Sequence, residues 1–316
     1  MTILAGTIVK FAGAGTGLVV NGSLQAQGTG QAPVVFTSIN DNNVGGGTGT
    51  GTPAPADWSG VQVNGGGTLN LTYTTVSYAA SPAVSNNGGT VELTNAMLTA
   101  NGPDLSYTGC PTCSGEVVSH SGGATSLNGT TITGFERAGY PGGAAYGVNA
   151  TGGGTLSISN SNFVVGSGPS ARFVYGALID GSRGAVATSI TGSTFSGGID
   201  GVYATYPDAL TVTGNTFTTS NYPIFLAHPR WSTAPTISGN TVLGPGPVGI
   251  GLDGHVSGNL TLPVVAGLPY VVDNCDGCAL TVDPAGTLTL PAGLVMKFRA
   301  LGVGLVVDGT LQAQGT

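Results

Sequence analysis

The chain has very little charge, and basic residues are the scarcest. Only 7 lysines and arginines stand against 14 aspartates and glutamates in 316 residues, which gives a formal net charge of −7. Nucleic acids and anionic lipids are bound through clustered lysines and arginines, and the sequence has no such cluster. No apolar run approaches the roughly 20 residues that cross a bilayer. We therefore expect no nucleic-acid partner and no membrane insertion.

Helical periodicity is also missing. No ten-residue window shows a 3.6-residue apolar period free of glycine or proline. The 57 glycines do not follow the strict triplet of collagen, and β-branched and aromatic residues alternate with clusters of glycine, asparagine and serine. A mean hydropathy of +0.27 with low charge argues against disorder. The predicted fold class is all-β.

The beginning of the chain recurs near its end. Residues 5–29 (AGTIVKFAGAGTGLVVNGSLQAQGT) align without a gap with residues 292–316 (AGLVMKFRALGVGLVVDGTLQAQGT) at an offset of 287. Of the 25 aligned pairs 16 are identical, among them Lys10 with Lys297 and Leu24 with Leu311. We expect a single solenoid domain over residues 1–316, in which one period of 287 residues is followed by the opening of the next. The expected partner is a further copy of the repeat, joined head to tail, and Met1 is interpreted as the start of an excised fragment.

A shorter motif recurs within this period. An apolar residue, four mostly polar or small residues and a second apolar residue come back every 22–34 residues. Glycine or asparagine in the four-residue bridge suits a bend between two short strands, and the flanking apolar residues are expected to point inward and stack on those of the next coil. The seven pairs of anchors are Leu71 and Val76, Leu93 and Leu98, Leu127 and Ile132, Ile158 and Phe163, Ile190 and Phe195, Val212 and Phe217, and Ile237 and Val242.

These motifs resemble the right-handed parallel β-helix repeat family, in particular large secreted or cell-surface bacterial β-helix proteins. The motif covers about residues 68–253, and residues 34–38, 57–61 and 269–272 are similar to the outer parts of such proteins. The resemblance implies a right-handed parallel β-helix (a β-solenoid) of about a dozen coils, located outside the cell or on its surface. Uncapped ends are expected, because apolar Ile3 and Leu4 stand at the start and residues 315–316 lie in the middle of a repeat. Phe163, Phe195 and Phe217 are expected to stack in one inner corner. Variable loops are expected at residues 41–57 and 101–114.

Two functions are compatible with such a fold, because β-helices carry many activities and none. The preferred function is structural: a repeat unit that forms a head-to-tail fibre, stalk or adhesin shaft and is not an enzyme. The alternative is a β-helix that binds or cleaves a glycan along the face from Asp180 to His255, with surface glycans as partners.

The catalytic candidates for the alternative are Asp180, Asp200, His228 and Asp253. His228 and Asp253 each lie eleven residues after a motif anchor, so they are expected to share one exposed register. The opposing interpretation is that aspartate beside glycine, as at Asp180, Asp200 and Asp253, is ordinary turn chemistry.

Cysteine is rare and occurs in two close pairs, Cys110 with Cys113 and Cys275 with Cys278. Four thiolates can hold Zn²⁺, but 165 residues separate the pairs, which places them several coils apart along the axis. Closure of a small disulfide loop by each pair, in an oxidising extracellular setting, is preferred. Free thiols, disulfides between units and a metal site remain the alternatives.

No cofactor is expected, and calcium is the one ion considered. Residues 40–43 (Asn-Asp-Asn-Asn) offer oxygen ligands, with Asp41 as the metal candidate. Strong calcium sites combine several carboxylates with carbonyl groups, and this loop has one carboxylate. A loop without an ion is therefore the default interpretation.

Overall fold

The chain is built almost entirely of strands. The computed structural model describes residues 1–102, 115–133, 144–165, 173–219, 221–246, 248–273, 279–299 and 304–315. Within these residues the only helix is η1 (Gly181–Arg183), a single turn of 3₁₀ helix. In the described part of the chain no helix has the length and hydrophobicity needed to span a bilayer. The all-β prediction is confirmed.

Three long parallel sheets form the sides of the molecule. The first sheet contains β1 (Thr2–Leu4), β4 (Ser23–Gln27), β7 (Thr68–Thr72), β10 (Thr90–Thr94), β13 (Ala124–Asn128), β16 (Gly154–Ser159), β19 (Val186–Thr191), β22 (Leu210–Thr213) and β25 (Thr236–Ser238). The second contains β2 (Ile8–Phe11), β5 (Val34–Ser38), β8 (Thr74–Ser77), β11 (Met97–Thr99), β14 (Thr131–Thr133), β17 (Asn162–Val164), β20 (Thr194–Ser196), β23 (Thr216–Thr218) and β26 (Thr241–Val242). The third contains β3 (Leu18–Val20), β6 (Val61–Asn64), β9 (Val84–Asn87), β12 (Gly115–His120), β15 (Ala144–Thr151), β18 (Phe173–Asp180), β21 (Asp200–Thr205), β24 (Ile224–Ala227), β27 (Ile250–Asp253), β30 (Tyr270–Val272) and β33 (Met296–Phe298).

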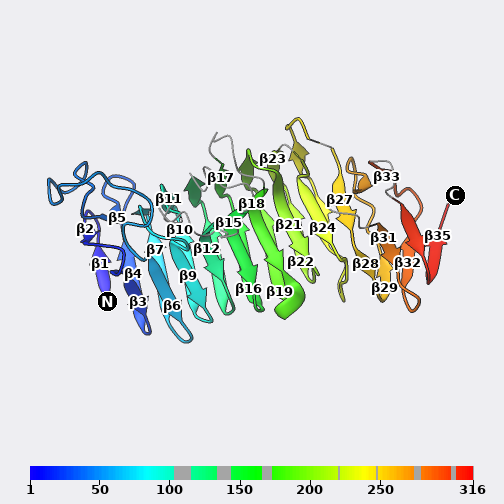
Figure 1. Ribbon diagram of the computed structural model, residues 1–316, viewed down its shortest axis with the longest axis horizontal. Helices are drawn as coiled ribbons and strands as arrows, with labels where there is room; N and C mark the ends of the chain where they lie inside the picture. The colour runs from blue at the N-terminus through cyan, green and yellow to red at the C-terminus, as the bar shows by residue number, and fades with distance from the viewer. Residues whose placement is uncertain are drawn as a thin grey trace.

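Each coil contributes one strand to each side before the chain rises to the next coil. Consecutive strands along the chain therefore lie in different sheets, and neighbouring strands within each sheet are three places apart in the chain. The result is a right-handed parallel β-helix of about a dozen coils, elongated along its axis, with the two termini at opposite ends (Figure 1). Parallel strands need such crossover connections, and these are right-handed in nearly all proteins.

After β27 two of the three sheets end and two new sheets begin. The first and second sheets end at β25 and β26, whereas the third sheet continues through β30 and β33. Two shorter sheets complete the last coils. The fourth contains β28 (His255–Val256), β31 (Leu280–Val282) and β34 (Leu305–Val307), and the fifth contains β29 (Asn259–Thr261), β32 (Thr287–Leu290) and β35 (Thr310–Ala313).

The seven-fold motif forms the corner between the first and second sheets. The first anchors pair in register from Leu71 to Ile237, and the second anchors pair from Val76 to Val242. The second residue of each bridge has a φ between 43° and 67°, the left-handed conformation that glycine and asparagine adopt most readily. These seven residues are Tyr73, Asn95, Gly129, Asn160, Gly192, Gly214 and Gly239.

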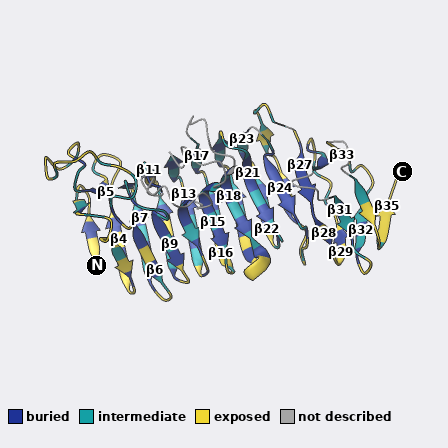
Figure 2. Ribbon diagram, in the orientation of Figure 1, coloured by how far each residue is buried: buried dark blue, intermediate teal, exposed yellow. Residues whose placement is uncertain are grey.

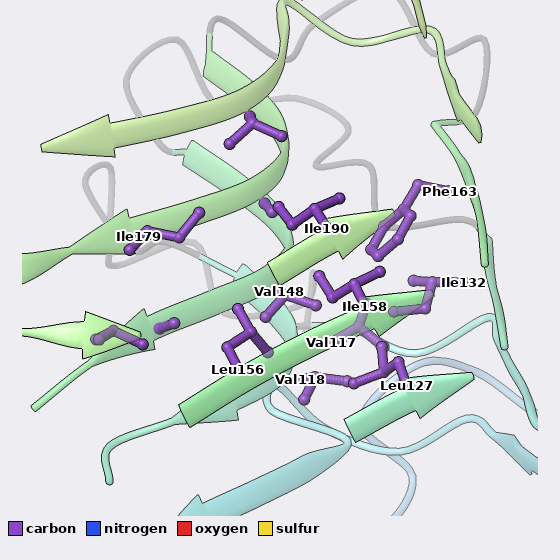
Figure 3. Packing of buried hydrophobic residues seen from close by; sticks show 14 of the residues in the cluster. Val117, Val118, Leu127, Ile132, Val148, Leu156, Ile158, Phe163, Ile179 and Ile190 are labelled. Atoms are coloured by element: carbon purple, nitrogen blue, oxygen red, sulfur yellow. The ribbon is translucent and has the colours of Figure 1, made fainter. Parts of the chain in front are cut away.

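Apolar side chains fill the interior of the coils, with exposed residues at the turns and at the two end coils (Figure 2). The rings of Phe163 and Phe195 stack with centroids 4.7 Å apart, and those of Phe195 and Phe217 are 5.1 Å apart. Figure 3 shows Phe163 beside Ile132 and Ile190 in this core. Trp58 is fully buried and stacks on Phe11 at 4.1 Å, so that it closes the inside of an early coil.

Candidate functional site

A groove runs along the corner where the third sheet turns into the next coil. The connections after β18, β21 and β24 meet the turn between β28 and β29 there, and the connection between β24 and β25 spans residues 228–235. The groove has a volume of about 450 Å³, and its lining includes Ser182, Tyr206, Asp208, Arg230, Trp231 and Asn259. Aromatic rings, two opposite charges and neutral polar groups therefore share one surface depression.

Three stacked rings form one side of this corner. The rings of Tyr206 and His228 lie 5.0 Å apart, and those of His228 and His255 lie 6.1 Å apart. Tyr206 and His228 both have positive φ values, 48° and 46°, because each occupies the first position of the turn after its strand. The guanidinium carbon of Arg230 lies 4.8 Å from the centroid of the Tyr206 ring, within the range of a cation–π contact.

Asp208 fixes the loop that carries Arg230 and Trp231. Its carboxylate accepts hydrogen bonds from the Ser232 amide (2.9 Å) and the Ser232 hydroxyl (3.0 Å). Burial alone would raise the pKa of Asp208, but these bonds and those from the amides of Thr233 and Ala209 lower its pKa below the ordinary value. The carboxylate therefore stays ionised across the neutral range and holds the loop against the turn that follows β21.

The structure does not bring the four catalytic candidates together. Asp180 caps η1 by accepting from the Ser182 amide at 2.8 Å. Asp180 and Asp253 lie in the same column of the third sheet but three coils apart, which is about 14 Å. The two carboxyl groups of a glycosidase lie roughly 5–9.5 Å apart, so this pair is too distant for that geometry.

The expected alignment of Asp253 with His228 is wrong by one residue. Asp253 pairs with Ala227, and the residue opposite His228 is Gly254. The connection from Val242 to β27 is one residue longer than the connection from Phe217 to β24, so the count of eleven residues ends one position earlier in the strand. His255 instead takes the place in the ring stack that was expected for Asp253.

Asp200, the remaining candidate, is buried at the start of β21. One carboxylate oxygen accepts from the Tyr222 amide (2.8 Å) and from the Asn221 side chain (3.1 Å). Burial raises the pKa of Asp200 to about 6, although both hydrogen bonds oppose the shift. A carboxyl group that titrates near neutrality is a feature of many catalytic sites and also of structural networks.

Asp200 belongs to a network that ties four coils together. The Tyr222 hydroxyl donates to Asp273 (2.8 Å), and the Arg299 guanidinium donates to both Asp273 (2.7 Å) and Asn221 (2.7 Å). Arg299 occupies the position that Ala12 has in the first copy of the repeat. This network was not expected from the sequence, because its bonded pairs lie up to 78 residues apart and follow no local motif.

The metal candidate Asp41 is held by hydrogen bonds at the start of its loop. The carboxylate oxygens of Asp41 accept from the Thr37 hydroxyl (2.9 Å) and the Asn43 amide (3.2 Å), while Lys10 binds the Asp41 carbonyl oxygen. Among the described residues there is no group of three or more metal-binding side chains. The four cysteine candidates, Cys110, Cys113, Cys275 and Cys278, lie outside the described residues.

Sequence reasoning missed Trp231, the tryptophan that lines the groove. It packs partly against the core and partly lines the depression. The available signal was the cluster His228-Pro229-Arg230-Trp231 in an eight-residue connection, at a corner where other coils need as few as two or three residues. Loops that depart from the length of their neighbours often carry function.

Searches against protein-family models, curated proteins and solved structures gave no match. No relative therefore supplies a role for the groove or for the buried network.

Proposed function

We propose that the chain is a structural segment of a repeating β-solenoid shaft, placed outside the cell or on its surface, and that it catalyses no reaction. The fold is compatible with this role, because coils of one kind are stacked into an elongated body (Figure 1). A solenoid coil buries its apolar side chains only against coils on both sides, so its natural state is a continuing array.

The proposal rests on the equivalence of residues in the two copies of the repeat, since a coil that covers the first copy can also cover the second. In the first copy Phe11, Val20 and Leu24 are 8%, 6% and 4% exposed. Their equivalents Phe298, Val307 and Leu311 are 48%, 41% and 38% exposed. The side chains of the second copy are those that a further coil covers in the first copy, which favours assembly with another copy of the repeat.

Purified chain should therefore associate end to end. We expect rods of increasing length in negative-stain micrographs and a sedimentation coefficient that rises with protein concentration. Leu311→Lys places a charge on the uncovered apolar edge and should weaken the association. Ser182→Lys is the control, because it adds the same charge to the exposed side of the rod and should leave association unchanged. A buried position such as Thr125 would not serve, because Thr125→Lys would disturb the core. Monomers at every concentration, with no fibres in native material, would contradict the proposal.

A second candidate function, glycan binding, is favoured by the groove. Sugar rings present C–H faces that pack on aromatic side chains, and hydroxyl groups that pair with polar ones. Trp231 and Tyr206 supply the aromatic surface, and Asp208, Arg230 and Asn259 supply the polar groups. A depression with an apolar surface and a few polar groups is the usual form of a ligand site.

Tryptophan fluorescence offers a direct test of this second candidate. The chain has two tryptophans, and Trp58 is fully buried, so a ligand in the groove should change the emission of Trp231 alone. Titration with short neutral oligosaccharides should give a saturable change that Trp231→Phe abolishes. Release of reducing sugar would add cleavage to binding. An emission that no oligosaccharide alters would count against a glycan site here.

A further inference from the structure

The internal repeat does not return to the same side of the rod. Leu24 lies in β4 and its equivalent Leu311 lies in β35, thirty-one strands later. With three strands in each coil, this interval is ten coils and one strand. The second copy therefore begins one side further around the coil than the first.

The sheet pairings show the same displacement at each equivalent strand. β2 belongs to the second sheet, whereas its equivalent β33 belongs to the third. β3 belongs to the third sheet, whereas its equivalent β34 belongs to the fourth. The third sheet runs unbroken through both copies, so one continuous side of the rod carries different strands of the repeat in each copy.

The first strand beyond the ends of the first and second sheets is β28, which follows β27 after the single residue Gly254. Gly254 has a φ of 87°, and a Cβ atom there would lie 2.6 Å from Nδ1 of His228. Only glycine fits this tight turn. Because of this turn, only one residue separates β28 from β27. In the preceding coil, the eight-residue loop that carries Trp231 separates the corresponding strands.

We infer that successive copies of the repeat dock in a turned orientation, each rotated about the rod axis by one side of the coil relative to the copy before. The edge formed by β33, β34 and β35 is the surface that receives the next copy. This inference rests on the proposed shaft function and adds the geometry of the junction.

The first copy specifies what covers this edge. Trp58 stacks on Phe11, so the Trp58 of a second copy covers Phe298. Val20 pairs with Val63 and Leu24 pairs with Leu69, so Val63 and Leu69 of the second copy cover Val307 and Leu311. The three exposed side chains thus each have a defined partner, and the unpaired strand edges gain a ladder of hydrogen bonds.

The rotation between successive copies determines which strands each side of the shaft exposes. Three copies are needed before a side of the rod carries the same strands again. Thirty-one strands on three sides, at about 4.8 Å between neighbouring strands, give a rise of about 50 Å for each copy. The corner groove would therefore appear on three different sides of the rod in turn.

Engineered disulfides in the full chain test the turn without requiring assembly. Val271 and Lys297 are paired neighbours in β30 and β33, at a spacing that a disulfide can bridge. Val271→Cys with Lys297→Cys should cross-link on mild oxidation, and peptide mapping by mass spectrometry separates this link from native cysteines. A copy that returned to the same side would place β34 next to β30 instead, so Val271→Cys with Val306→Cys is the matched alternative pair.

Cross-linking of the Val271 and Lys297 variants, with no cross-linking of the Val271 and Val306 variants, supports the rotation between copies. Cross-linking of the second pair, or of neither, overturns it while leaving the shaft proposal intact. A chain of residues 1–316 followed by residues 30–316 then tests docking, with one straight rod expected and Trp58 of the added copy on Phe298 in its structure. Two bodies joined by a loose linker would overturn the shaft proposal and the docking together.

Discussion

The stacked phenylalanines show how much of the interior depends on single side chains. Phe195 lies between Phe163 and Phe217 and is almost completely buried. Its truncation leaves a cavity that two rigid neighbouring coils cannot close. We expect Phe195→Ala to lower the free energy of unfolding by about 3–5 kcal/mol, measured by chemical denaturation.

Phe298→Ala is the matched control in the same chain. That ring is about half exposed, so its removal should cost less than about 1 kcal/mol in the unassembled protein. Equal losses at the two positions would contradict the assignment of inside and edge positions.

Asp200 gives a pH dependence of known sign. Its pKa is about 6 in the folded chain and 3.8 in the unfolded chain. The folded state therefore binds the proton more tightly, and the stability that this contributes is present below pH 3.8 and lost as the pH rises through 6. The size of the loss is about 3 kcal/mol. Asp200→Asn should raise the unfolding free energy at pH 7–8 by up to this amount and leave it unchanged near pH 4.

Asp200→Ala separates the charge from the hydrogen bonds. Asparagine keeps an oxygen for the Tyr222 amide and the Asn221 side chain, whereas alanine leaves both donors without this acceptor. The alanine variant should therefore be the less stable of the two. A wild-type chain that is no less stable at pH 8 than the asparagine variant would contradict the buried-carboxylate account.

At this scale the sequence identifies inside positions better than buried polar ones. Phe163, Phe195 and Phe217 are marked by their place in a repeated motif. Asp200 stands beside Gly201, which is typical of an exposed turn, yet it is buried and accepts a hydrogen bond from the Tyr222 amide of the next coil. Such burial depends on a neighbour 22 residues away and has no local signature.

Among the elements, the corner bend of the motif requires a left-handed backbone conformation, and this requirement can be tested apart from side-chain packing. Gly214 has a φ of 67°, and a Cβ atom there would meet no atom nearer than 3.9 Å. Gly214→Ala therefore adds backbone strain without a clash and should cost about 1–2 kcal/mol in unfolding free energy. Gly15→Ala is the control, because Gly15 has open space and no left-handed φ, and it should be neutral or slightly stabilising. A Gly214→Ala chain as stable as wild type would contradict the bend geometry.

Strand register could be predicted wherever the connections keep their length. The motif gives the correct pairing from Leu71 to Ile237, because its five-residue gap fixes the corner in every coil. The register of Asp253 could not be predicted, because one additional residue between β26 and β27 shifts the count. The groove escaped prediction for the same reason, since it depends on loops of unequal length that meet at one corner.

For the whole molecule, the scarcity of charge predicts indifference to salt. Two ion pairs occur among the described residues, His255 with Asp283 and Arg299 with Asp273, and both include an exposed partner. Screening of such pairs changes stability little. Raising NaCl from low concentration to about 1 M should alter the unfolding free energy by less than about 1 kcal/mol. A loss of several kcal/mol would mean that charge holds the coils together.

The long repeat predicts which residues are equivalent but not on which side of the rod they lie. An offset of 287 residues fixes the alignment of Lys10 with Lys297, and the number of strands within that offset depends on loop lengths. The 31 strands within that offset are not a whole number of three-strand coils, and this displaces the second copy by one side. The architecture could thus be predicted from the sequence, whereas the side of the rod on which the second copy begins required the three-dimensional structure.

The parallel pairing of all described strands also gives the rod a direction. Every coil is wound in the same sense and climbs the same way, so no two-fold axis perpendicular to the rod can relate its halves. An array built from such units is polar, as an arrow is, with a base and a tip that expose different surfaces. A molecule that attaches at one end cannot attach in the same way at the other, and the orientation of each unit is set when the first one is anchored.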